Sequence, residues 1–145
     1  MIAVDTNILV YAHRPEMPFH LEAVAALGRL ARGPGRWAVP WPCIHEFIAV
    51  VTNSRIYRTA TPIGEAFRAV RALAATNRTE MISEAEGYLD CLEALALPAR
   101  LQGATVHDAR IAAICMQHGI AELWTADRDF SRFPSLAVRN PLFDA

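Results

Sequence analysis

The sequence predicts a single α/β domain over residues 1–145, with a parallel β-sheet of four to five strands and helices on both faces. Short apolar, β-branched runs alternate along the chain with longer segments whose apolar residues recur every three or four positions. The chain has 145 residues, 53% of them hydrophobic, and no repeat or low-complexity linker divides it. Strands that alternate with helices form parallel sheets covered on both sides.

The first strand is expected at residues 1–4, which include the β-branched Ile2 and Val4. Asp5 does not fit a buried run, so it falls at the carboxyl end of this strand. Thr6 and Asn7 are typical N-cap residues, and the apolar residues 8–10 continue as a helical turn. Ligands bind at the carboxyl edge of open parallel sheets, which makes Asp5 a candidate functional carboxylate. The alternative is that Asp5 only caps the following helix.

A helix follows over residues 19–32 and ends at Gly33. Its periodicity places five apolar residues on the inward face: Leu21, Val24, Ala25, Leu27 and Leu30. Residues 37–39 form a short strand. Pro42, at the first helical position, opens a second helix that continues to about residue 52. Residues 53–62 are a loop.

The second half of the chain repeats this alternation. Pro62 opens a helix to about residue 75, with Ile63, Phe67, Val70 and Leu73 facing inward. Residues 79–82 are a strand, and Ser83 caps a helix that Pro98 ends. Residues 107–118 are helical with Gly119 as the C-cap, residues 122–125 form a strand, and residues 136–138 an edge strand.

Four acidic residues fall at boundaries between these elements. Asp5 and Asp127 follow strands, whereas Glu46 and Asp108 lie in the first turns of helices. An acid at the start of a helix has an ordinary explanation, because it complements the helix dipole. In a parallel sheet, however, strand ends and the following helix starts share one edge. We therefore expect the four carboxylates to lie close together, with Asp129 two residues beyond Asp127.

Four converging carboxylates repel one another and raise one another's pKa values. A divalent cation removes this repulsion. Ligand sets made only of oxygen, without a cluster of cysteine or histidine, select Mg²⁺ or Mn²⁺ over zinc. Such a site suits phosphodiester hydrolysis, in which the metal activates water and stabilises the leaving oxygen.

The acidic motifs resemble those of PIN-domain ribonucleases, and most closely the VapC-type toxins of type II toxin–antitoxin modules. The resemblance covers nearly the whole chain and rests on four segments in the family's order. These are Asp5-Thr-Asn7, the Glu46 helix start after Pro42, Asp108-Ala-Arg-Ile-Ala, and residues 125–130 with Thr125 and Asp127.

By position, Asp5, Glu46, Asp108 and Asp127 match the family's catalytic and metal-binding quartet. Asn7 matches its amide, and Thr125 matches its hydroxyl. Asp129 is an additional acid that competes with Asp127 for the fourth role, and the Thr-x-Asp spacing favours Asp127. The resemblance implies a Mg²⁺- or Mn²⁺-dependent endoribonuclease with an RNA substrate. It also implies a homodimer and inhibition by a small antitoxin whose tail enters the active-site groove.

Several residues are candidates for contact with RNA or with the antitoxin. His13 and Arg14 follow the first helix near the same edge, and Trp41 could stack on a base. Arg110 and Arg128 suit a phosphate or a carboxylate. The loop of Arg55, Tyr57 and Arg58 has the composition of an RNA surface, while Tyr11 and Phe19 offer an apolar surface for an antitoxin helix. Three of these groups have a structural alternative: His13 and Arg14 as a solvated helix end, Trp41 as a side chain that shields the helix start, and residues 55–58 as an ordinary loop.

His45 and His107 each precede a quartet acid. Adjacent residues on a helix point about 100° apart, so neither histidine is an evident ligand of the same site.

Composition excludes several other classes. All 14 basic residues are arginine, so a P-loop lysine, a Schiff-base lysine and the lysine of an aspartyl-phosphate site are absent. The net charge of −1 is not that of a general nucleic-acid binder. No apolar run approaches the ~20 residues of a membrane span, and no basic segment precedes the first apolar run as in a signal peptide. The odd number of cysteines, Cys43, Cys91 and Cys115, predicts reduced thiols and a cytoplasmic location.

The sequence also has two rival interpretations of its function. An aspartyl-phosphate phosphatase usually has a second acid two residues after the first, where this chain has Asn7. The stronger alternative is a catalytically quiet PIN-like module that binds RNA or a protein partner. The complete acidic quartet argues against it, because crowded carboxylates repel phosphate.

Overall fold

The computed structural model describes residues 1–143 and contains one five-stranded sheet in the order β3-β2-β1-β4-β5. All four strand pairings are parallel. The strands are β1 (Ile2–Val4), β2 (Trp37–Pro40), β3 (Thr79–Ile82), β4 (Glu122–Trp124) and β5 (Val138–Arg139). The predicted α/β fold with a parallel sheet is therefore confirmed.

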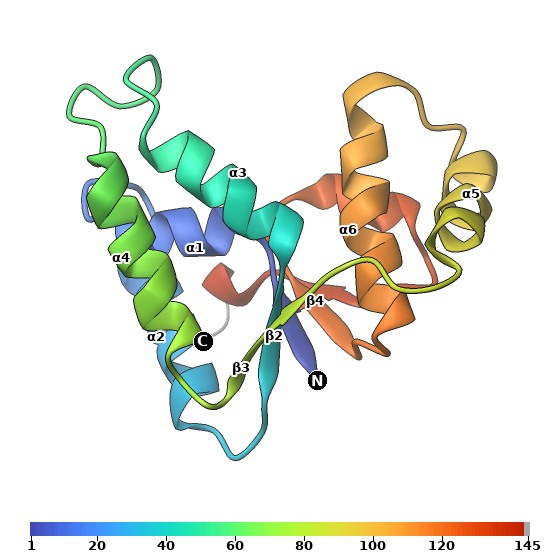
Figure 1. Cartoon of the computed structure of the whole chain (residues 1–145), viewed down its shortest axis with the longest axis horizontal. Coiled ribbons are helices and arrows are strands. Elements are labelled where there is room, and N and C mark those ends of the chain that lie inside the picture. Colours follow the sequence, from blue (N-terminus) through green and yellow to red (C-terminus); the bar gives the residue numbers. More distant parts are fainter. Residues whose placement is uncertain (144–145) are drawn as a thin grey trace.

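The helices cover both faces of this sheet, as predicted. Those on one side are α1 (Thr6–His13), α2 (His20–Arg32) and α4 (Ile63–Ala74), and those on the other are α5 (Tyr88–Ala99) and α6 (Val106–Gln117) (Figure 1). Helix α3 (Trp41–Val51) follows β2 at the carboxyl end of the sheet. Three 3₁₀ turns complete the chain: Gly103–Thr105, Arg128–Arg132 and Pro141–Phe143. Within residues 1–143, every helix is too short or too polar to cross a membrane.

Strand β1 lies in the centre of the sheet, between β2 and β4, and two of its three residues are fully buried. Ala3 and Val4 have no exposed surface, and the same is true of Val39 on β2 and Leu123 on β4. The backbone N–H of Asp5 donates to the carbonyl of Trp124 at 3.0 Å, so the pairing of β1 with β4 extends to the carboxylate. The central position of β1 thus places Asp5 in the middle of the carboxyl edge.

The inward faces predicted for α2 and α4 are wrong for their largest residues. Leu21 is 77% exposed and Phe67 is 49% exposed, and Val24, Ala25 and Ile63 are exposed as well. The fully buried positions are alanines: Ala23 and Ala26 on α2, and Ala66 on α4. Small side chains allow the helices to pack closely, so the buried stripe is rotated from the one that the large residues suggest. Leu27, Leu30, Val70 and Leu73 pack against the core as expected.

Several boundaries also differ from the sequence-based expectation. Asp5 itself is the N-cap of α1, where Thr6 and Asn7 were expected. Ser83 caps no helix: α5 begins at Tyr88 after Gly87, whose φ of 83° is left-handed, and Pro98 lies inside its last turn. The final strand is Val138–Arg139, because the backbone N–H of Leu136 still closes a turn onto the carbonyl of Phe133.

Candidate active site

Asp5 is a buried carboxylate held by several donors. The residue is only 4% exposed to solvent. Oδ1 accepts the N–H of Thr6 at 2.7 Å, and Oδ2 accepts the hydroxyl of Thr125 at 2.7 Å. Burial raises the pKa of Asp5 above its usual value, and these hydrogen bonds oppose the rise. Asp5 therefore caps α1 and also presents a fixed carboxylate at the edge of the sheet.

Asn7 and Thr125 connect the ends of β1 and β4. The Asn7 amide donates to Asp5 Oδ2 and to Thr125 Oγ1, both at 3.1 Å, and its Oδ1 accepts the N–H of Ala126 at 3.0 Å. The Thr125 hydroxyl, which donates to Asp5, accepts the N–H of Asp127 at 3.0 Å. The two residues expected to support the acids thus fix the segment that carries Asp127.

Glu46 projects into the site from α3. It is held there by a hydrogen bond from Thr6 that the sequence did not predict. The hydroxyl of Thr6 donates to Glu46 Oε2 at 3.0 Å. One turn earlier on α3, the buried thiol of Cys43 donates to Asp5 Oδ1 at 3.4 Å. Burial keeps the pKa of this thiol well above its usual value, so it remains a donor. The spacing of three residues between Cys43 and Glu46 was the available signal, since such residues share a helix face.

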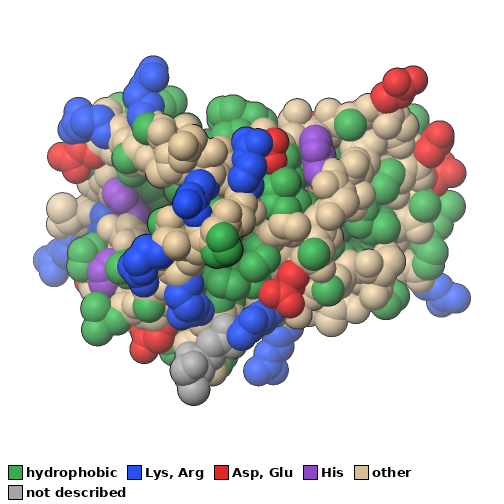
Figure 2. All heavy atoms as spheres, turned by 90° about the horizontal axis from the view of Figure 1, so that it is seen from below, with side chains coloured by type: hydrophobic (Ala, Val, Ile, Leu, Met, Phe, Trp, Pro, Cys, Tyr) green, Lys and Arg blue, Asp and Glu red, His purple; other side chains and the backbone are tan. Residues whose placement is uncertain are grey.

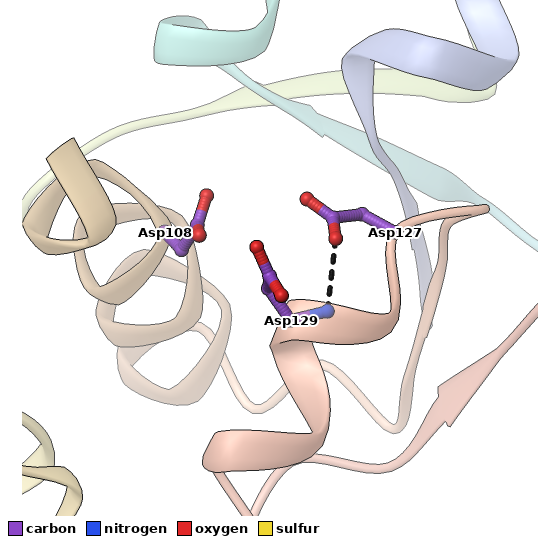
Figure 3. Close-up of side chains that lie close together, drawn as sticks. All are labelled: Asp108, Asp127 and Asp129. Carbon is purple, nitrogen blue, oxygen red and sulfur yellow. Dashed lines mark hydrogen bonds between the residues drawn. The ribbon is translucent and has the colours of Figure 1, made fainter.

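Asp108, Asp127 and Asp129 form a second group of carboxylates (Figure 3). One oxygen from each lies within 4.8 Å of the others. Asp127 Oδ1 accepts the backbone N–H of Asp129 at 2.8 Å, which opens the 3₁₀ turn at Arg128. Partial burial, and then the charges of Asp127 and Asp129, raise the pKa of Asp108 to about 6. The group therefore has strong mutual repulsion.

All four predicted quartet acids line one hollow of about 270 Å³. Asp5 follows β1, Asp108 lies in the first turn of α6 as predicted, and Asp127 follows β4. The prediction for Glu46 is wrong by one turn: α3 begins at Trp41, so Glu46 lies in its second turn. The opposite wall is largely apolar and includes Val10, Tyr11, Met17, Val50 and Tyr57. We call this space the acid hollow. Asp127 lines it and Asp129 does not, although both belong to the carboxylate group at its edge.

The residues of the acid hollow fit a hard divalent cation. Its ionisable lining residues are carboxylic acids and two tyrosines, and none of the described lining residues is cationic. Asp108, Asp127 and Asp129 have ligand oxygens close enough to share one ion, and Asp5 and Glu46 face the same space. Carboxylate oxygens favour Mg²⁺ or Mn²⁺. Charge is distributed differently at the amino edge of the strands, where arginine side chains are prominent on the surface (Figure 2).

Two of the predicted contact residues, His13 and Arg14, bind a neighbouring loop and do not line the acid hollow. Arg14 donates to Thr61 Oγ1 at 3.0 Å and to the carbonyl of Thr59 at 2.8 Å, and its guanidinium lies 4.1 Å from the centre of the Tyr57 ring. His13 bonds Thr61 at 3.1 Å and packs against Phe47. Tyr57, expected to be exposed, is buried by these contacts, whereas Arg55 and Arg58 are exposed.

The remaining candidates lie around the site. Trp41 is 41% exposed and lines a separate apolar hollow between α3 and α4. Arg110 forms an ion pair with Glu84. Arg128 is exposed and directly follows Asp127. Their contacts with RNA or an antitoxin stay predictions.

Comparison with known proteins identifies the family. The profile of the PIN domain matches residues 2–136. The chain belongs to the PIN domain family. Among its relatives, Ribonuclease VapC43 of Mycobacterium tuberculosis is 34% identical over 142 residues, which cover 98% of this chain and 96% of the relative. Ribonuclease VapC48 of the same species is 29% identical over 137 residues, or 94% of each chain. These matches place this PIN domain among the VapC proteins.

Solved structures share the same PIN fold. VapBC2 of Rickettsia felis, bound to a DNA fragment from its promoter, includes a chain that superposes with a TM-score of 0.72 at 21% identity and covers 97% of this PIN domain and 98% of its own length. VapC20 of Mycobacterium tuberculosis, described as a toxin that cleaves the sarcin–ricin loop, gives a TM-score of 0.65 at 21% identity, with coverage of 90% and 93%.

Proposed function

We propose that this protein is a Mg²⁺- or Mn²⁺-dependent endoribonuclease that hydrolyses phosphodiester bonds in RNA. The observation that carries the proposal is the convergence of Asp5, Glu46, Asp108 and Asp127 on one hollow at the carboxyl edge of the sheet. The names of the relatives, which are ribonucleases at 29–34% identity over nearly the whole chain, support the choice of RNA.

The carboxylates have different tasks in this proposal. Asp5, Asp108 and Asp127 would hold the ion, with Asp129 beside them. A bound divalent cation supplies Lewis-acid polarisation of the phosphate and lowers the pKa of water. Asp5 is fixed by its hydrogen bonds, so its carboxylate would be held in place to bind the ion. Thr6 holds Glu46 through Oε2, which leaves Oε1 to accept a proton from the attacking water.

The direct test is cleavage of a mixed RNA pool by the purified protein with Mn²⁺, Mg²⁺ or EDTA. We expect fragments only with metal and none from Asp108→Asn. Asp90→Asn is a matched control, because Asp90 is an exposed acid in the first turn of α5. RNA binding without cleavage under every metal condition would instead support the catalytically quiet binding module.

We further propose that the protein is the toxin of a VapBC-type pair and that a small antitoxin inhibits it. Several of its structural neighbours were solved as VapBC or toxin–antitoxin complexes. An arginine or lysine of the antitoxin could pair with the carboxylates of the acid hollow, which has no cation of its own among the described lining residues. Phe19 is 39% exposed, and the centre of its ring lies 6.1 Å from that of Tyr11. It offers an apolar surface beside the acid hollow.

Titration calorimetry with the product of the neighbouring reading frame tests this inhibition. We expect tight binding without metal, weaker binding with excess Mn²⁺, and lower affinity for Glu46→Gln. An affinity that neither Mn²⁺ nor this substitution changes would place inhibition away from the acid hollow.

A homodimer is also part of the proposal. Leu89 and Leu97 on α5 are 73% and 68% exposed and offer an apolar surface for a second copy. Light scattering should give the mass of two chains for the wild type and of one for a Leu89→Asp/Leu97→Asp variant. The three thiols described as free agree with the reducing cytoplasm that we propose as the location.

A further inference from the structure

A second hollow adjoins the acid hollow between α3 and α6. Its volume is about 500 Å³, and Glu46, Asp108 and Ile111 line both spaces. The second hollow is also lined by His45, His107 and Arg110. We call it the histidine groove. Because the two spaces share lining residues, an extended RNA strand bound at the acids would continue directly into the histidine groove.

The two histidines of this groove differ from the other three in the chain. His13, His20 and His118 each bond another part of the protein: Thr61 Oγ1, the Tyr11 carbonyl and the Ser83 carbonyl, respectively. Within residues 1–143, neither His45 nor His107 has a hydrogen bond or ion pair, and both are exposed. The histidines without an intramolecular partner are thus the pair that faces one shared groove.

The positions of these histidines follow from helix geometry. His45 precedes Glu46 on α3, and His107 precedes Asp108 on α6. Neighbouring residues on a helix point about 100° apart, so each acid lines the acid hollow and the preceding histidine does not. His45 also borders the apolar hollow between α3 and α4. In each helix the acid therefore lines both spaces, and the histidine before it lines the groove but not the acid hollow.

We propose that the histidine groove is an RNA subsite, in which His45 and His107 donate hydrogen bonds to the phosphate next to the scissile one. This inference rests on the proposed ribonuclease function. An imidazole N–H is a donor suited to phosphate oxygen, and the same groove is lined by Arg110, whose guanidinium is paired with Glu84. Among the described residues, neither histidine belongs to a group of three metal-binding side chains, so a phosphate fits the pair better than a metal ion.

Single-turnover cleavage of an RNA pool separates binding from chemistry. Two hydrogen bonds to a charged phosphate are removed in His45→Ala/His107→Ala, so the enzyme concentration at half-maximal rate should rise by at least about tenfold. The maximal rate should stay within about twofold, since the acids remain. Replacing both histidines by glutamine, which keeps an N–H donor, should restore part of the affinity. His118→Ala, at the other end of α6, is the matched control and should change neither value.

Two further measurements keep this test independent of the proposed function. Mn²⁺ should raise the melting temperature of the double variant as much as that of the wild type; a lost shift would make the histidines metal ligands and overturn the proposal. If the wild type cleaves no RNA, the proposed function fails, and binding of a labelled single-stranded RNA then tests the groove by itself. Equal RNA affinity of wild type and double variant, or a loss confined to the maximal rate, would overturn the subsite.

Discussion

Asp5 and Asp108 line the same hollow, but their carboxylates have opposite surroundings. Asp5 is 4% exposed and accepts hydrogen bonds from Thr6, Asn7, Cys43 and Thr125. Asp108 is half-buried, and its closest electrostatic partners are Asp127 and Asp129, which have the same charge. One side of the hollow is a preformed network, whereas the other is a charge cluster that a cation would stabilise. Mutation of the same residue type should therefore change the stability of the protein differently at the two positions.

The largest expected difference is between Asp5→Asn and Asp108→Asn. Each should lower cleavage by at least about a thousandfold, because metal-ion stabilisation of transition-state charge amounts to several kcal/mol. Their stabilities should move in opposite directions. An amide at position 5 replaces one acceptor oxygen with an NH₂ donor that faces other buried donors, so the free energy of unfolding should fall by about 1–3 kcal/mol. The amide at position 108 removes a repelling charge and should raise the free energy of unfolding by about 1 kcal/mol. The gain is small because this carboxylate is partly exposed and solvent screens the repulsion.

Urea unfolding in EDTA measures both values. A destabilised Asp108→Asn variant, or an Asp5→Asn variant as stable as the wild type, would show that the two sides of the hollow do not differ in this way.

Substitutions of Asp127 and Asp129 sharpen the description of the charge cluster. At a Mn²⁺ concentration of 100 times the dissociation constant, linkage should stabilise the wild type by about 2.7 kcal/mol. Asp127 lines the acid hollow and Asp129 does not, so Asp127→Asn should lose most of this stabilisation and Asp129→Asn should retain most of it. Thermal unfolding across a Mn²⁺ series decides between them, and the reverse order would assign the fourth role to Asp129.

The pH dependence of stability should come mainly from Asp108. Its pKa is about 6 in the folded protein and near 3.8 in the unfolded chain, so the folded state binds more protons between these values. The metal-free protein should therefore lose stability as the pH rises from about 4 to 6. Asp108→Asn should flatten this slope in melting curves recorded in EDTA. A slope of equal size in the variant would show that another group, such as Asp5, dominates.

The smallest effect is expected at Cys43. Cys43→Ala removes one donor to Asp5 and leaves a small space, while Cys43→Ser keeps a donor. We expect Cys43→Ala to weaken Mn²⁺ binding by about tenfold, the lower end of the range for partners of metal ligands, with Cys43→Ser closer to the wild type. Calorimetric titration with Mn²⁺ measures this. Equal affinities in all three proteins would make Cys43 a packing residue only.

The sequence was sufficient for the fold and for the four acids because both follow from local order. A strand of Ile2 and Val4 ends where Asp5 begins, and parallel strands bring such ends to one edge. The faces of α2 and α4 could not be obtained in this way, because alanines and not the larger Leu21 and Phe67 are buried. The contact of Cys43 with Asp5 joins residues 38 positions apart, and the burial of Tyr57 depends on the position of Arg14. Such contacts depend on the packing of distant segments, which local sequence patterns do not predict.

The hydrogen bond between Thr125 and Asp5 has a consequence for protein synthesis. It joins residues separated by 120 positions, and Asp127 lies beyond the later of the two. A nascent chain on the ribosome therefore carries Asp5 without the partners that complete the hollow until residues 125–127 have been made. Pairing of such distant segments is also slow relative to local helix formation. The order of the sheet thus delays assembly of the acid hollow until Asp127 has left the ribosome.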